Sequence, residues 1–167
     1  MQATLTFLPI VDVEASGLHL QSYPIEIAVL VPDDVASWLI TPEPGWTYWN
    51  VVAEAMHGIS RSMLHEQGTG ALTVARELNA LVKTLGGVLY SDAVEWDLDW
   101  IRTLYSTVRT SLEFEVLPIQ QLLSFKQRLK FAEARQQLET SGRYRTHRAG
   151  PDVRLIHEAY CQSLARR

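Results

Sequence analysis

The sequence predicts an α/β fold in which helices flank a mixed β-sheet. Residues 7–40 contain three short apolar runs separated by turn residues, which is typical of an antiparallel meander. The remainder alternates short strand-like runs with longer stretches of helical periodicity, a pattern that adds parallel strands to a sheet. The chain has 167 residues, 47% of them hydrophobic, which suits one well-filled core. We therefore expect a single domain over residues 1–167.

The first three strands are predicted from apolar runs bounded by turns. They are expected at residues 7–14, 23–31 and 36–40. The first run is rich in Ile and Val, which predicts a buried central strand, and it ends in Asp12-Val13-Glu14 before a Ser-Gly turn. A loop rich in Pro and Gly follows the third strand. Its aromatic cluster, Trp46, Tyr48 and Trp49, could either stack bases or close the edge of the sheet.

Helical periodicity dominates the rest of the chain. Helices are predicted at residues 50–67 in two pieces, 71–85, 94–108, 124–140 and 151–164, with strands at 88–90 and 114–119. The helix at 71–85 is the clearest, because an apolar stripe runs along it and Gly86-Gly87 follows it. The fourth helix opens with Ser124-x-x-Gln127, which has the form of a capping box.

The net charge of -4 is distributed unevenly along the chain. Residues 1–125 carry 5 Lys and Arg against 15 Asp and Glu, whereas residues 126–167 carry 10 against 4. A basic C-terminal segment beside an acidic body suggests either an edge on which a polyanion docks or a solvated basic helix face.

Composition also limits the cellular setting. The single cysteine, Cys161, excludes an internal disulfide and a cysteine-rich zinc site. The sequence shows no secretory signal pattern and no apolar run of the roughly 18 residues that a membrane span needs. We expect a soluble, cytoplasmic protein that has no membrane partner.

Asp12 and Glu14 are the first candidates for chemistry. Side chains at i and i+2 of a strand project from the same face, so the two carboxylates would lie side by side. They would repel one another unless a cation lay between them, and oxygen-only ligands suit Mg²⁺ or Mn²⁺. Taken alone, the pair is better explained by a turn cap and a solvated carboxylate.

Later acidic positions could reach the same edge of the sheet. Asp97 lies early in the helix that follows a short strand, whereas Asp99 is about 200° further round that helix and cannot share its face. Asp92 is expected to cap the strand-to-helix turn. His147 precedes the last helix and Asp152 lies in its first turn, where a carboxylate is ordinarily a favourable helix charge.

Together these motifs resemble the DEDDh group of the proofreading-exonuclease superfamily, which has an RNase H-like fold. Three motifs occur in the family's order: Asp12-Val13-Glu14 followed by Ser16-Gly17-Leu18, Trp96-Asp97 after a short strand, and His147-x-Ala149-x-x-Asp152. His57-Gly58-Ile59 also resembles the His-Gly-Ile that often follows the third strand in these enzymes. The motifs span residues 7 to 160, essentially the whole chain.

The chain departs from the family pattern in two places. Ala15 follows Glu14 where members often have Thr. The stretch from Ser91 to Asp97 stands where members often have His-Asn-x-x-Phe-Asp. Trp96 replaces one aromatic residue with another, so we expect its packing to survive. The missing Asn leaves local hydrogen bonding and substrate preference open.

The resemblance implies a 3′-to-5′ exonuclease that hydrolyses single-stranded DNA or RNA to nucleoside 5′-monophosphates. Asp12, Glu14, Asp97 and Asp152 would hold two divalent metal ions, Mg²⁺ or Mn²⁺, one at the attacking water and one at the leaving 3′ oxygen. His147 would be the general base. Because an ordinary imidazole titrates near pH 6.5, activity should rise from about pH 6 to about pH 8.

The resemblance also implies partners and substrate contacts. Its substrate-binding residues would be Gly17, Leu18, His57 and Ile59, although Ile59 could equally be a simple core residue. Arg143, Arg145 and Arg148 surround His147 in the sequence and are our candidates for phosphate contacts. The partners would be the 3′ ends of single-stranded DNA or RNA, and a homodimer is also open because several enzymes of this kind are dimers. Two other functions stay open, a non-catalytic nucleic-acid-binding module and a hydrolase of dinucleotides or small phosphodiesters with the same fold.

Overall fold

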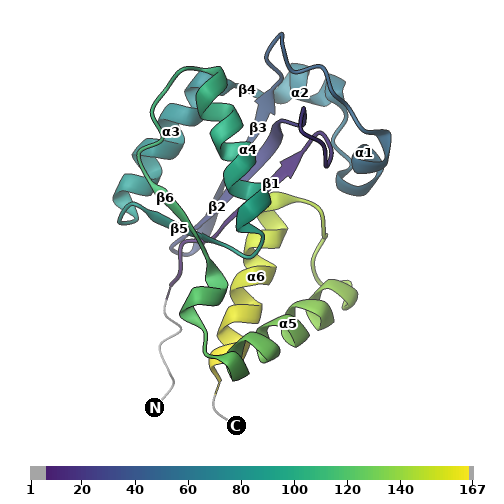
Figure 1. Cartoon of the computed structure of the whole chain (residues 1–167). Coiled ribbons are helices and arrows are strands. Elements are labelled where there is room, and N and C mark those ends of the chain that lie inside the picture. Colours follow the sequence, from purple (N-terminus) through teal and green to yellow (C-terminus); the bar gives the residue numbers. More distant parts are fainter. Residues whose placement is uncertain (1–6, 166–167) are drawn as a thin grey trace.

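The structure, a computed structural model, describes residues 7–165, so residues 1–6 and 166–167 of the predicted domain lie outside the described residues. A central sheet lies between two layers of helices (Figure 1). In chain order the elements are β1 (Val11–Ala15), β2 (Pro24–Val31), β3 (Asp34–Thr41), α1 (Val51–His57), α2 (Arg61–Gln67), β4 (Thr69–Gly70), α3 (Ala71–Thr84), β5 (Val88–Ser91), α4 (Val94–Thr107), β6 (Glu115–Pro118), the 3₁₀ helix η1 (Ile119–Leu122), α5 (Phe125–Thr140) and α6 (Ala149–Leu164).

The sheet is mixed, as predicted. β1, β2 and β3 pair in antiparallel order, and β3 continues into a short parallel pair with β4. β5 and β6 are parallel to each other. They join the first sheet where Ile10 forms a parallel bridge with Tyr90, and the N–H of Tyr90 donates to the carbonyl of Pro9. Through this bridge the strand order is β4-β3-β2-β1-β5-β6, which makes β1 a central strand.

Two hydrophobic cores fill the space on either side of the sheet. Helices α3 and α4 cover one face, and α5 and α6 cover the other (Figure 1). Ile27 of β2 packs into the α3–α4 core with Ile101, whereas Leu30 packs into the α5–α6 core with Ile156. Because β2 is buried on both faces, its sequence is a nearly continuous apolar run.

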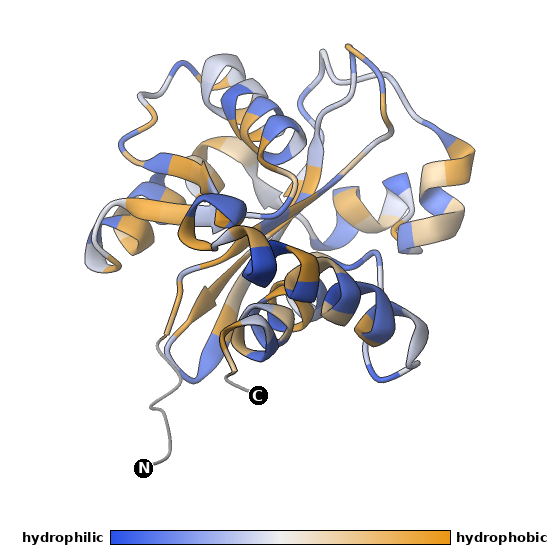
Figure 2. Cartoon of the chain, turned by 60° about the horizontal axis from the view of Figure 1, so that its bottom comes forward, coloured by the Kyte–Doolittle hydropathy of each residue, from blue (hydrophilic) through white to orange (hydrophobic). Residues whose placement is uncertain are grey.

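The hydropathy of the elements follows this layering. The strands are largely hydrophobic, and the helices carry hydrophilic residues among their apolar ones (Figure 2). Within residues 7–165, no helix combines the length and the apolar character needed to cross a membrane.

The first strand differs from its predicted bounds. It begins at Val11 and continues through both carboxylates to Ala15, because β2 pairs with it as far as Pro24. The register shifts between Glu14 and Ala15. Both acidic residues therefore lie within the paired strand, which sets the direction of their side chains.

The last helix also begins earlier than predicted, at Ala149 rather than Pro151. Arg148 occupies the N-cap position and its side chain makes no capping bond to the helix. Instead, the N–H of Ala149 donates to the Glu26 carboxylate of β2 at 3.0 Å. The predicted capping box of Ser124 on α5 is present.

The aromatic loop is largely internal. Trp46 is 7% exposed, stacks on Tyr23 and donates from its indole N–H to Thr107. Tyr48 stacks on His19. These contacts bury Trp46 within the protein, where it is not available to stack bases, and whether the loop closes the edge of the sheet stays a prediction.

We predict that Glu26→Ala lowers the free energy of unfolding by about 3 kcal/mol. Glu26 and Arg148 form a bidentate ion pair in which both side chains are mostly buried, so truncation leaves the guanidinium unpaired and α6 without its cap. Urea unfolding measures the change. The control is Arg154→Gln, whose contact with the exposed Asp34 should contribute less than about 1 kcal/mol. Equal losses in both variants would contradict the role given to Glu26.

Candidate active site

The central strand directs two carboxylates to one face of the sheet. Val11, Val13 and Ala15 point into the core under α3 and α4. Since successive side chains of a strand alternate, Asp12 and Glu14 point to the opposite face, toward α6. The prediction that these two carboxylates share a face is confirmed.

Asp152 joins them from the first turn of α6. Carboxylate oxygens of Asp12, Glu14 and Asp152 lie within 4.8 Å of one another. Oδ2 of Asp12 is buried and has no hydrogen-bond partner among the described residues. A buried carboxylate oxygen without a donor is costly, and a cation would compensate it. This all-oxygen group fits a hard divalent ion such as Mg²⁺ or Mn²⁺.

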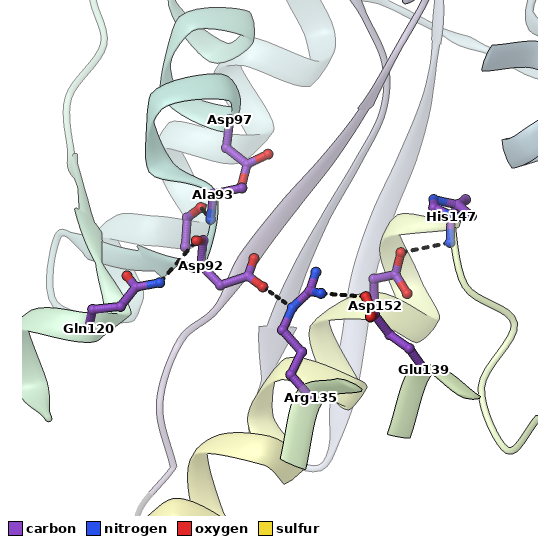
Figure 3. Close-up of polar contacts among 9 residues, drawn as sticks. Asp92, Ala93, Asp97, Gln120, Arg135, Glu139, His147 and Asp152 are labelled. Carbon is purple, nitrogen blue, oxygen red and sulfur yellow. Dashed lines mark hydrogen bonds and ion pairs between the residues drawn. The ribbon is translucent and has the colours of Figure 1, made fainter. Parts of the chain in front are cut away.

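Asp97 approaches the same place from α4, outside this group of three. It lies in the first turn of that helix, is 2% exposed and accepts a hydrogen bond from the hydroxyl of Ser91 at 2.5 Å. Its charge is one of those that raise the pKa of Asp12. Figure 3 shows Asp97 on one side of this region and Asp152 with His147 on the other.

Burial raises the pKa of each of these carboxyl groups. The pKa of Asp12 lies well above its ordinary value because of burial and then repulsion from Asp97. Burial and repulsion from Asp152 raise the pKa of Glu14 to about 8, and burial raises that of Asp97 to about 8. Burial raises the pKa of Asp152 to about 6, although the N–H of His147 opposes this shift. Carboxyl groups of this kind release protons when a cation binds.

His147 has an uncommon backbone conformation. Its φ of 61° lies in the left-handed region, which non-glycine residues seldom adopt. Its N–H donates to Oδ2 of Asp152 at 2.9 Å, so the residue is tied to the carboxylate group while its side chain stays exposed. This hydrogen bond joins the first and last residues of the His147-x-Ala149-x-x-Asp152 motif.

A pocket of about 310 Å³ opens beside Glu14 and His147. Three of the residues predicted to bind substrate line it, namely Gly17, Leu18 and His57. Ile59 does not line it and is fully buried in the α3–α4 core.

Gly17 permits the close contact that builds this pocket. A Cβ at this position would lie 2.8 Å from the Cβ of Asn50 and 2.9 Å from a ring carbon of Tyr48. The N–H of Asn50 donates to the carbonyl of Ser16, and the Asn50 side chain caps α1. The end of β1 and the start of α1 are therefore held together, which places α1 as one wall of the pocket.

His57 contributes a polar group to this wall. The residue is 2% exposed, and Nδ1 accepts a hydrogen bond from the N–H of Ile59 at 3.0 Å. Nε2 has no partner among the described residues. Burial lowers the pKa of His57, which favours the neutral ring. Because Nδ1 accepts, the proton of the neutral ring resides on Nε2, which makes that atom a donor.

Asp92 does not cap α4 as predicted. The N–H of Ala93 donates to the Ser91 hydroxyl, and the Asp92 carboxylate forms an ion pair with Arg135 of α5. Sequence reasoning missed Arg135, because one arginine within a basic helix carries no pattern that links it to a distant acid.

The packing expected of Trp96 is partial, since 46% of this residue is exposed.

The three arginines near His147 differ in their surroundings. Arg148 donates to both carboxylate oxygens of Glu26, at 2.9 and 2.7 Å, so its guanidinium is held by the sheet. Arg143 pairs with Glu158. Arg145 has no ion-pair partner among the described residues and reaches over Gly58 at the end of α1. Phosphate binding by Arg148 stays a prediction.

A comparison with known proteins finds solved structures with a similar fold. No protein-family model matches the sequence, and no curated protein matches it significantly. E. coli exonuclease I in complex with a dT13 oligonucleotide matches with a TM-score of 0.69 at 13% identity over 92% of this chain. The zinc-ion-bound form of the E. coli ExoI–ssDNA complex matches with a TM-score of 0.67 at 12% identity over 93% of this chain. The chain spans 40% and 39% of the length of these two proteins.

A shorter protein matches over nearly its whole length. The nuclease domain of 3'hExo, a DEDDh family member bound to rAMP, has a TM-score of 0.69 at 16% identity over 94% of this chain and 90% of that one. Structural matches at identities this low establish the fold alone. The predicted fold, a mixed sheet flanked by helices, is confirmed, and it matches the fold of E. coli exonuclease I and of the 3'hExo nuclease domain.

We predict that the metal-free protein is less stable at pH 8 than at pH 5.5, and that Glu14→Gln removes part of this difference. The folded-state pKa of Glu14 is about 8, above the value near 4.5 of an ordinary Glu, so the folded state binds more protons between these values. Its stabilising contribution is therefore present below about pH 4.5 and lost as pH rises to 8.

Urea unfolding in EDTA at both pH values measures this effect. The pH-dependent loss should be about 1 to 3 kcal/mol smaller in Glu14→Gln than in the wild type. The two proteins share every other titrating group, so the comparison reports Glu14 together with its effect on the pKa of Asp12. An identical loss in both would show that Glu14 has no raised pKa.

Proposed function

We propose that the protein is a metal-dependent 3′-to-5′ exonuclease that hydrolyses single-stranded DNA or RNA and releases nucleoside 5′-monophosphates. The observation that carries the proposal is the group of half-buried carboxylates, Asp12, Glu14 and Asp152, beside the exposed His147 and a pocket. The shared fold of the 3'hExo nuclease domain, which is bound to rAMP, supports the same reading.

The carboxylates give the site its capacity for cations. Asp12, Glu14, Asp97 and Asp152 would hold two divalent ions, Mg²⁺ or Mn²⁺, which would supply Lewis acidity at the phosphate and lower the pKa of nearby water. The unpartnered Oδ2 of Asp12 and the raised pKa values of the group support this assignment.

His147 would act as the general base. An imidazole nitrogen would accept a proton from the attacking water as its oxygen bonds to phosphorus. The bond between phosphorus and the 3′ oxygen then breaks, and that oxygen takes a proton from solvent. The hydrogen bond from the His147 N–H to Asp152 supports this role, because it holds the residue at the edge of the carboxylate group.

The pocket suits one unpaired nucleotide. Its volume of about 310 Å³ is at the lower end of small-molecule sites. Leu18, Met56 and Trp100 offer apolar surface to a base, and Nε2 of His57 offers a donor. Gly17 would let the nucleotide approach the backbone closely.

A second candidate is the hydrolysis of dinucleotides or other small phosphodiesters. Two of the three arginines expected near the phosphates, Arg143 and Arg148, are already paired with Glu158 and Glu26. With fewer unpaired arginine side chains beside the site to bind phosphates, a short substrate would be favoured over a long strand. Relative rates on a dinucleotide and on a 20-mer separate the two candidates.

We predict that 5′-labelled single-stranded DNA or RNA, incubated with the protein and Mn²⁺ or Mg²⁺, shortens from its 3′ end into a ladder. EDTA and Asp12→Asn should each abolish the ladder, because both remove the cation site. Gel electrophoresis resolves the products. Absence of cleavage of both polymers and of a dinucleotide would leave the non-catalytic binding module as the better reading.

We further predict that Met56→Ala raises KM about fivefold for an oligonucleotide and leaves kcat nearly unchanged, since it removes apolar contact of about 1 kcal/mol with the bound base. Val51→Ala is the matched control, because Val51 is exposed on the same helix but does not line the pocket. Steady-state kinetics distinguish the two variants. Equal effects on KM would place the base elsewhere.

A further inference from the structure

Arg135 lies beside the carboxylate group, and the proposed mechanism does not use it. Its Nε donates to Asp92, and its Nη1 donates to Glu139 one turn further along α5. The Asp92 side chain is 5% exposed, so this ion pair is mostly shielded from water on its acidic side. The two partners together hold the plane of the guanidinium.

The third nitrogen of the guanidinium is left for another partner. Nη2 of Arg135 makes no hydrogen bond to the described residues, whereas both other nitrogens do. In Figure 3 this nitrogen is directed to the same side as the Asp97 and Asp152 carboxylates. The Arg135 side chain is 36% exposed, so Nη2 is accessible to a ligand as well as to water.

The charge of Arg135 reaches the site. Burial is the main cause that raises the pKa of Asp97 and Asp152, and the Arg135 charge opposes it at both groups. Burial lowers the pKa of Arg135 itself, but Asp92, Glu139 and Asp12 outweigh burial and raise it. The guanidinium therefore stays charged at the place where an anionic substrate would meet the carboxylates.

We propose that Arg135 is a phosphate-binding residue of this site, with Nη2 donating to a non-bridging oxygen of the scissile phosphate. The inference rests on the proposed function and adds a specific contact to it. Arginine suits the task because its planar fork can bind carboxylates on two sides and a phosphate oxygen on the third. Asp92 and Glu139 act as positioning residues, since they orient the fork.

The test compares ligands that differ only in the phosphate. The wild type, Arg135→Gln, Arg135→Lys and Lys126→Gln are titrated with dTMP and AMP, and with thymidine and adenosine, in the presence of Mg²⁺. Arg135→Lys can keep the ion pair with Asp92, so this variant should fold normally. It has no second nitrogen to reach the phosphate, so it tests the contact without loss of folding. Lys126 is exposed on the same helix and controls for the loss of one positive charge.

Both Arg135 variants should bind the monophosphates about tenfold more weakly, the usual effect of losing a hydrogen bond to a charged group, and the nucleosides unchanged. Lys126→Gln should bind all four ligands as the wild type does. Unchanged monophosphate binding in Arg135→Lys and Arg135→Gln, or equal weakening of the nucleosides, would overturn the assignment.

The oligonucleotide ladder separates this result from the proposed function. If the wild type cuts oligomers but the Arg135 variants bind monophosphates normally, the Arg135 contact alone is wrong. If the wild type binds monophosphates through Arg135 but cuts no substrate, the nuclease proposal fails and the phosphate site stands. A wild type that does neither would contradict both.

Discussion

The buried carboxylate of Glu26 ties the start of α6 to the sheet. It lies opposite Glu14 in the pairing of β1 with β2, and it holds both Arg148 and the first N–H of α6. His147 and Asp152 flank this attachment on either side in sequence. The placement of both residues next to the strand carboxylates therefore depends on this ion pair together with the packing of α6 on the sheet, and Glu26 itself does not belong to the group of candidate ligands.

In the folded protein, many of the basic residues of the C-terminal segment form ion pairs with acidic residues. Every ion pair among residues 7–165 uses an arginine from the basic C-terminal segment. Three of these pairs reach acids in the N-terminal body, at Glu26, Asp34 and Asp92. Much of the basic segment thus holds α5 and α6 against the sheet, and its net positive charge is a poor guide to how much nucleic acid the protein could bind.

Sequence reasoning succeeded where local periodicity decides the outcome. The alternation of β1 predicted that Asp12 and Glu14 share a face, and the angular spacing of α4 favoured Asp97. The sequence predictions were wrong where a contact with a residue far away in the sequence decides the local structure. The start of α6 depends on Glu26, 123 residues away, and the Asp92 ion pair joins residues 43 apart. No local pattern encodes such contacts, because they arise only when two elements pack.

One wall of the pocket belongs to a helix of only seven residues, α1. Isolated helices of this length are unstable in water, so α1 depends on the bond from Asn50 to Ser16 and on its cap. Its outward side chains Val51, Val52 and Met56 are exposed and add little packing energy. Local opening of α1 should require far less free energy than unfolding the sheet, and hydrogen exchange would report it. Ligand binding then includes the cost of ordering this wall, which links nucleotide affinity to the local stability of one short helix.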